Sequence, residues 1–110
     1  MEATERMFTS WDGAELFYRS WFPNQATDKA LLLFHRGHEH SGRWQETVDS
    51  LDLDDIAIFA WDARGHGRSP GDRGAAKSLH DVIKDVDAFA RHVSEKFGMP
   101  IENMIVLAHS

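Results

Sequence analysis

Ser110 is the residue of this sequence whose type and position most directly suggest chemistry. It follows the apolar run 105–108 and His109, and an apolar run that ends in small-x-Ser is the first half of the nucleophile elbow G-x-S-x-G, here with Ala108 in place of the first glycine. A serine hydroxyl becomes a good nucleophile only when a histidine accepts its proton. None of the seven histidines follows Ser110. We therefore expect the chain to be the N-terminal part of a serine hydrolase, truncated at the nucleophile elbow.

Two earlier segments place glycines and polar residues directly after apolar runs. Residues 35–44 (HRGHEHSGRW) follow the run 30–34, and residues 62–74 (DARGHGRSPGDRG) follow the run 56–61. A glycine-containing bend after a strand can aim a backbone N–H at the oxygen that becomes negative during acyl transfer. The first segment is therefore a candidate for part of an oxyanion hole.

The second segment begins with Asp62, which could be taken for a catalytic acid at the end of a strand. We favour a structural role, in which Asp62, Arg64 and His66 hold a glycine-rich loop by hydrogen bonds. Gly65 and Gly67 would permit its tight turns.

The histidines of the first segment, which are His35, His38 and His40, raise the question of a zinc site because imidazole is a good zinc ligand. The sequence has no cysteine and no later histidine cluster that would complete such a site. We expect no metal and no cofactor. His35 is expected to pack beneath the loop, and the other two histidines to be partly solvated.

The elements that must position these segments follow from the pattern of apolar residues. Alternating side chains over 15–22, preceded by a short strand at 6–10 and an Asp-Gly turn, predict an antiparallel hairpin. Three continuous apolar runs predict strands that are buried on both faces, as in a parallel sheet. These runs are 30–34, 56–61 and 104–108.

Two helices are predicted between these strands, over 43–53 and over 79–97. Ser78 suits the N-cap of the second helix and Gly98 suits its end. An apolar stripe with i, i+3, i+4, i+7 spacing is expected to face the core. It consists of Leu79, Val82, Ile83, Val86, Phe89, Ala90, Val93 and Phe97. The polar face, expected to be solvated, carries Lys84, Asp85, Asp87, Arg91, Glu95 and Lys96.

The order of these elements is hairpin, strand, helix, strand, helix, strand. It predicts an α/β fold with a mostly parallel sheet, an N-terminal antiparallel hairpin and right-handed crossovers. The segments after Phe34 and Trp61 and the end of the chain at Ser110 then meet at the carboxyl edge of the sheet, where sites form in such folds.

The bulk composition narrows the class of protein. The sequence is 42% hydrophobic and 27% charged, which is ordinary for a globular protein with a core. A net charge of −6 argues against nucleic acid as the main partner. The sequence shows no secretory signal and no apolar run long enough to span a membrane, so we expect a cytoplasmic protein.

Taken together, the two loop segments and the Ala-His-Ser ending resemble the monoglyceride lipase and lysophospholipase branch of the α/β-hydrolase superfamily, the serine aminopeptidase-like hydrolases. That branch shows H-G-x-G-E-H-S-G-R-Y after its third strand, D-x-x-G-H-G-x-S-x-G-x-R-G after its fourth and G-H-S-x-G after its fifth. The resemblance covers almost the whole chain, with the three motifs in the same order. It departs from the pattern at Arg36 and His38, where the family usually has glycine.

This resemblance implies a carboxylic-ester hydrolase with a monoacylglycerol- or lysophospholipid-like substrate. Ser110 would form the acyl-enzyme and the Gly37 N–H would be one oxyanion donor, while the acid and the histidine would come from a part of the fold that follows. It also implies a structural role for the loop after the fourth strand.

Two alternatives stay open. The family pattern is often associated with aminopeptidases, so a peptidase is one of them, whereas Ser110 counts against the superfamily members that use an aspartate nucleophile. The other alternative is a non-catalytic piece, in which Ser110 is an ordinary serine and an unfinished sheet with an uncovered edge strand binds a partner. On either reading we expect the 110-residue chain alone to be inactive.

Overall fold

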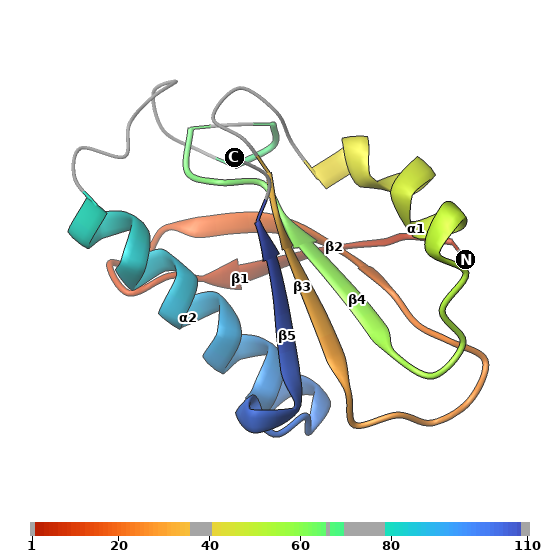
Figure 1. Cartoon of the computed structure of the whole chain (residues 1–110). Coiled ribbons are helices and arrows are strands. Elements are labelled where there is room, and N and C mark those ends of the chain that lie inside the picture. The colour runs from red at the N-terminus through yellow and green to blue at the C-terminus, as the bar shows by residue number, and fades with distance from the viewer. Residues whose placement is uncertain (1, 36–40, 66, 70–78, 109–110) are drawn as a thin grey trace.

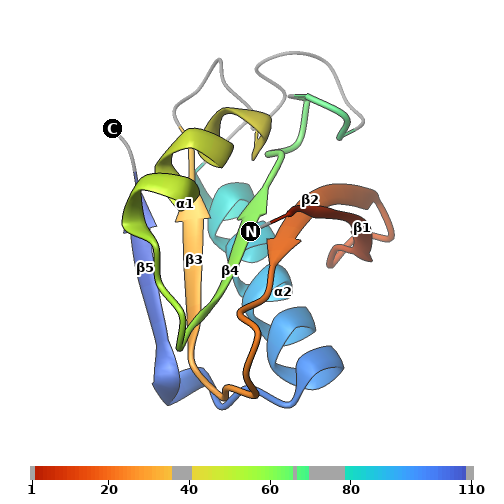
Figure 2. The same ribbon diagram turned by 90° about the vertical axis from the view of Figure 1, so that its right-hand side faces the viewer.

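The computed structural model describes residues 2–35, 41–65, 67–69 and 79–108. Their elements form one five-stranded sheet with a helix on each face (Figure 1 and Figure 2). Helix α2 (Leu79–Phe97) covers one face and the shorter α1 (Gln45–Leu51) lies on the other.

The strand order is β1-β2-β4-β3-β5. Strands β1 (Thr4–Thr9) and β2 (Glu15–Trp21) form the predicted antiparallel hairpin, and β4 (Ala57–Trp61) pairs antiparallel with β2. Strand β3 (Ala30–Phe34) pairs in parallel with both β4 and β5 (Met104–Ala108). The sheet is thus mixed, with the hairpin at one edge and β5 at the other.

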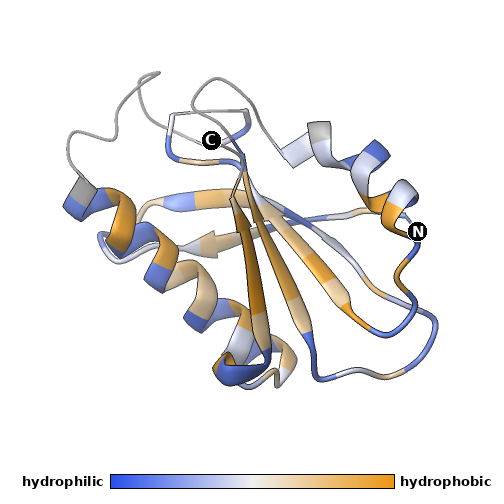
Figure 3. Ribbon diagram, viewed as in Figure 1, coloured by the Kyte–Doolittle hydropathy of each residue, from blue (hydrophilic) through white to orange (hydrophobic). Residues whose placement is uncertain are grey.

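Two apolar clusters fill the space between the sheet and its helices. One packs the strands against Phe89 and Val93 of α2, and the other packs them against Val48 of α1. Strands β3 and β4 supply both clusters because successive side chains point to opposite faces, and every residue of these two strands is buried. The prediction of strands buried on both faces is confirmed for β3 and β4, which are largely apolar along their length (Figure 3).

The same prediction is wrong for β5 within the described part of the chain. Ile105, Val106 and Leu107 are 59%, 58% and 45% exposed. The physical reason is position: β5 is the edge strand of the described sheet, and neither helix covers it as β3 and β4 are covered.

The predicted helix over 43–53 is shorter than expected. A 3-10 turn, η1 (Ser41–Trp44), precedes α1, and Asp52 ends the helix with a left-handed φ of 47°. A second 3-10 turn, η2 (Ile101–Asn103), leads into β5.

Helix α2 has the predicted bounds, and Gly98 ends it with a φ of 68°. Two predictions about its faces are wrong. Ile83, assigned to the apolar stripe, is 56% exposed, whereas Asp85, assigned to the solvated face, is 4% exposed. Asp85 is buried because it binds partners from two other segments, as described below. Ser78, the predicted N-cap, lies outside the described residues.

Candidate active site

Strands β3, β4 and β5 run in parallel, so their carboxyl ends lie together at the same end of the sheet (Figure 1). Phe34 pairs with Ala108, so the ends of β3 and β5 that precede Gly37 and Ser110 in the sequence lie side by side. Gly37 and Ser110 themselves lie outside the described residues, as do Arg36, His38 and His66. The described residues around them define how the site is supported.

The two residues that flank segment 36–40 in the sequence, His35 and Ser41, both bind the loop after β4. On the N-terminal side of this segment, the backbone N–H of Ala63 donates to Nε2 of His35 over 3.0 Å. A ring nitrogen that accepts a hydrogen bond carries no proton, so neutral His35 has its proton on Nδ1. On its C-terminal side, the N–H of Ser41 donates to the carboxylate of Asp62. Two consecutive residues, Asp62 and Ala63, therefore bind the residues on either side of this segment.

Asp62 is 1% exposed and accepts a second backbone hydrogen bond, from Arg68 N–H over 2.8 Å. Its own carbonyl accepts from the Ser69 hydroxyl, and Ser69 Oγ in turn accepts from the N–H of Phe17 in β2 over 2.9 Å. The Asp62 N–H donates to the Phe17 carbonyl over 2.8 Å. The carboxylate thus accepts one backbone N–H from Ser41 and one from Arg68, an arrangement suited to holding these two segments together.

Glycine is required at two positions of this loop. Gly65 has a φ of 79° and Gly67 a φ of 52°, both in the left-handed region that side chains with a Cβ disfavour. The loop can therefore turn back so that Arg68 and Ser69 reach Asp62.

Arg64 fastens the same loop to α2 and to the hairpin. Its Nη2 and Nε donate to the two carboxylate oxygens of Asp85 over 2.9 and 3.2 Å, and Nη2 also lies 2.9 Å from Asp12 Oδ1. The Ser10 hydroxyl donates to Asp85 over 2.5 Å. Hydrogen bonds to Asp85 and then to Asp12 raise the pKa of Arg64, and the Arg64 guanidinium lowers the pKa of Asp12.

The hairpin also binds Ser41, which follows segment 36–40, and the loop after β4. Arg19 of β2 donates through Nε to the Ser41 hydroxyl over 3.1 Å and pairs with Glu5 over 3.1 Å, while Arg68 pairs with Glu5 over 2.7 Å. The guanidinium carbons of both arginines lie 5.1 Å from the centre of the Phe17 ring. The hydrogen bond from Arg68 is the main reason that the pKa of Glu5 is lowered.

Several of these supporting residues were not identified from the sequence. The burial of Asp85 could have been predicted, because Asp85 lies three residues after Val82 and four before Phe89, at the border of the apolar stripe. Ser41 and Ser69 stand within the two loop motifs, but the bond of Ser41 to Asp62 across 21 residues and that of Ser69 to Phe17 across 52 residues could not be read from the sequence.

Among the described residues, no group of three or more histidine, aspartate or glutamate side chains is placed to bind a metal ion. His38 and His40 lie outside that part of the chain. None of the helices described is both long and apolar enough to cross a membrane.

The sequence matches a known protein family over most of its length. Residues 25–110 match the family model of the serine aminopeptidases, S33. The chain belongs to this family of α/β-hydrolases. The resemblance noted in its motifs and the fold that this resemblance implied are thereby confirmed.

Two relatives show how much of a family member the chain represents. It is 48% identical over 107 residues to the uncharacterized protein YnbC of Escherichia coli (strain K12), covering 96% of this chain and 18% of YnbC. It is 33% identical over 100 residues to human monoglyceride lipase, covering 90% of this chain and 32% of that enzyme. The S33 chain thus spans about a third or less of these relatives.

A solved structure shows the same fold. A soluble variant of the monoglyceride lipase of Saccharomyces cerevisiae, in complex with a substrate analog, superposes with a TM-score of 0.74 at 23% identity. The match covers 100% of this S33 chain and 36% of the yeast chain.

Proposed function

We propose that this S33 protein hydrolyses carboxylic esters, with a monoacylglycerol- or lysophospholipid-like substrate. Ser110 is the nucleophile and the backbone N–H of Gly37 is one donor of the oxyanion hole. The acid and the histidine come from residues that follow Ser110 in the same fold. The proposal is supported above all by the hydrogen bonds of His35 and Ser41, which flank segment 36–40, to the loop after β4, and by the pairing of β3 with β5.

In the proposed reaction, the histidine takes the proton of Ser110 Oγ as this oxygen attacks the ester carbonyl carbon. The carbonyl oxygen becomes negative and is held by the Gly37 N–H and by the N–H of the residue after Ser110. The ester C–O bond breaks, the histidine gives its proton to the leaving alcohol, and the acyl group stays on Ser110. Water then attacks the acyl-enzyme by the same route and releases the carboxylic acid.

The loop after β4 has a positioning role in this proposal. The residues of this loop assigned to that role are Asp62, Arg64, Gly65, His66 and Gly67. His35, which follows β3, joins them by accepting the Ala63 N–H. A backbone donor must already point at the developing oxyanion to be effective, and loss of one donor typically slows catalysis on the order of a hundredfold or more. The hydrogen bonds of His35 and Ser41, which flank segment 36–40 in the sequence, support such a positioning role.

The test is active-site labelling of the full-length protein with a fluorophosphonate, followed by peptide mapping. We expect one adduct, on Ser110, that is lost in Ser110→Ala and retained in Ser50→Ala, which changes an exposed serine. Full labelling of Ser110→Ala would contradict the assignment. Relative kcat/KM values for monoacylglycerol, lysophospholipid and aminoacyl anilide substrates then separate the ester proposal from peptidase activity.

A non-catalytic role is the second candidate, and the exposure of β5 is the observation that favours it. On that reading the 110 residues bind a partner through the edge of the sheet. A full-length protein that is folded and yet takes no adduct on Ser110 would support this candidate over the hydrolase.

A further inference from the structure

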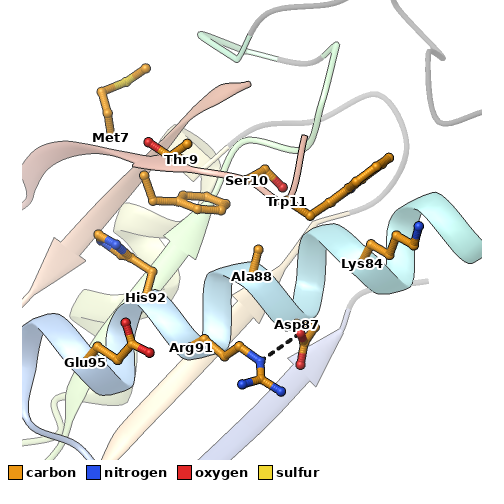
Figure 4. A pocket seen from close by; sticks show the side chains of 11 residues that line it. Met7, Thr9, Ser10, Trp11, Lys84, Asp87, Ala88, Arg91, His92 and Glu95 are labelled. Atoms are coloured by element: carbon orange, nitrogen blue, oxygen red, sulfur yellow. Dashed lines mark hydrogen bonds and ion pairs between the residues drawn. The ribbon is translucent and has the colours of Figure 1, made fainter. Parts of the chain in front are cut away.

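The edge of the sheet formed by β1 borders a groove that the proposed reaction does not use. The groove has a volume of about 660 Å³ and lies between β1, the turn that follows it and one side of α2 (Figure 4). Its helical wall is a stripe at three- and four-residue spacing: Lys84, Asp87, Ala88, Arg91, His92 and Glu95. Because β1 and β5 form opposite edges of the described sheet, this groove is separate from the β5 edge.

The backbone of β1 presents unpaired hydrogen-bonding groups along this edge. The Ser10 N–H donates to the Ala14 carbonyl over 2.8 Å, so this pair is a hydrogen-bonded pair of the hairpin. Such pairs alternate with non-bonded ones in an antiparallel ladder, and the register places Glu5, Met7 and Thr9 in non-bonded positions. The N–H and C=O groups of these three residues therefore point away from β2, toward an added strand.

We propose that the occupant of this edge is β1 of a second copy of the protein, paired antiparallel about a twofold axis at Met7. Sheets of two protomers are thereby joined into one continuous sheet. The dimer is inferred from the β1–α2 surface alone and is independent of the proposed ester hydrolysis.

The side chains of β1 fit this register. With Met7 opposite Met7, Glu5 lies opposite Thr9 and Arg6 opposite Phe8, so no like charges face each other. Met7 is 47% exposed in the single chain and gains an apolar neighbour. A twofold axis at Arg6 would instead place two arginines opposite each other, which is unfavourable.

Three contacts show how β1 runs along α2. Lys84 Nζ lies 4.3 Å from the Trp11 ring centre, the His92 ring lies 5.6 Å from that of Phe8, and the Arg6 guanidinium lies 5.0 Å from that of Phe97. Strand β1 therefore runs against the direction of α2. Met7, between Arg6 and Phe8, lies level with the helix between His92 and Phe97.

Within that interval, an axis level with Val93, midway between Arg91 and Glu95, would bring Arg91 of one copy toward Glu95 of the other, in two equivalent pairs. Arg91 is well exposed, and its ion pair with Asp87 uses Nε, on the inner part of the guanidinium. The surface is thus self-complementary in backbone, apolar side chain and charge, as a twofold interface requires.

Single cysteines test the register directly, because residues 1–110 contain none. Under mild oxidation, the full-length Met7→Cys protein is expected to yield, in mass-spectrometric mapping, a peptide pair joined by a disulfide between position 7 of the two copies. Thr9→Cys is the matched control: the two Thr9 Cα atoms are about 14 Å apart in this register, too far for a disulfide. The double variant Glu5→Cys/Thr9→Cys is expected to link position 5 to position 9.

Solution mass and charge reversal complete the test. We expect a dimer by light scattering, a dissociation constant roughly tenfold higher for Arg91→Glu, and recovery when Glu95→Arg is added. A monomer at all concentrations overturns the proposal. So does linking of Thr9→Cys as readily as Met7→Cys, or linking of Val106→Cys instead, which would place the interface at β5.

Discussion

Arg64, in the loop after β4, donates to both carboxylate oxygens of Asp85, in α2, over 2.9 and 3.2 Å. This pair joins the loop after β4, which binds His35 and Ser41, to the helix that covers one face of the sheet. The Asp85 side chain is 5% exposed and that of Arg64 is 18% exposed, so the pair is largely removed from water. Loss of Asp85 removes the buried carboxylate that both the Arg64 guanidinium and the Ser10 hydroxyl bind, although Asp12 still lies 2.9 Å from Arg64, and such a loss is costly.

We therefore predict that Asp85→Ala lowers the free energy of unfolding by about 2–4 kcal/mol. Asp87→Ala is the matched control on the same helix, because Asp87 is 61% exposed and pairs with an exposed Arg91. This control is expected to cost less than about 0.5 kcal/mol. Urea unfolding of the full-length protein measures both. Equal losses in the two variants would show that burial of the Arg64 pair contributes nothing.

Asp62→Asn is predicted to reduce stability more than reactivity at Ser110. An amide cannot accept from both Ser41 N–H and Arg68 N–H as a carboxylate does, since one of its terminal groups is a donor. A cost of about 1–3 kcal/mol is expected from the mismatched buried group. The two measurements are urea unfolding and the rate of fluorophosphonate labelling.

The exposed Asp54→Asn is the control for this variant, and it is expected to leave both quantities unchanged. The contrary outcome for Asp62→Asn, abolished labelling with stability retained, would make Asp62 a catalytic group rather than a positioning residue.

Local pattern predicted those parts of the molecule whose structure depends on neighbouring residues. The apolar runs of β3 and β4 predicted burial on both faces, and the stripe of α2 predicted its bounds, because apolar periodicity reports directly which side is buried. The contacts that support the site could not be read in this way. Ser10 and Asp85 bond across 75 residues of sequence, and Ser41 and Asp62 across 21, so their meeting depends on the finished fold.

The exposed edge strand β5 leads us to expect that the isolated 110-residue chain self-associates. Ile105 and Leu107 expose one face of the strand and Val106 the other, which is a template for association. We expect light scattering to show species larger than a dimer, and we expect the Val106→Lys variant to form less of them. Ile83→Lys replaces an equally exposed apolar residue on α2 and is expected to have no such effect. A similar reduction by both variants would mean that general hydrophobicity, not the open strand edge, drives association.

We expect His92 and Tyr18 to make the stability of the folded protein depend on pH. Nε2 of His92 lies 2.7 Å from the Tyr18 hydroxyl, beside the Phe8 ring. Burial, and then the nearby Lys96 and Arg6, lower the pKa of His92, so the folded state binds this proton less readily than the unfolded state. The contribution of neutral His92 to the free energy of unfolding is therefore fully present above the pKa of histidine in the unfolded chain, about 6.5. This contribution declines as the pH falls from about 6.5 toward the lowered pKa of the folded state.

The prediction is that the difference in stability between the native protein and His92→Gln narrows as the pH falls from 7 to 5. Glutamine can still bond to the Tyr18 hydroxyl but does not titrate, so the comparison isolates the proton on His92. Urea midpoints at several pH values measure this difference, and His80→Gln, at an exposed histidine on the same helix, is the control. Burial also raises the pKa of Tyr18 to about 12, so a second loss of stability is expected only above pH 10, where the unfolded tyrosine ionises first. A stability difference between native and His92→Gln proteins that stays constant from pH 7 to 5 would show that His92 titrates alike in both states.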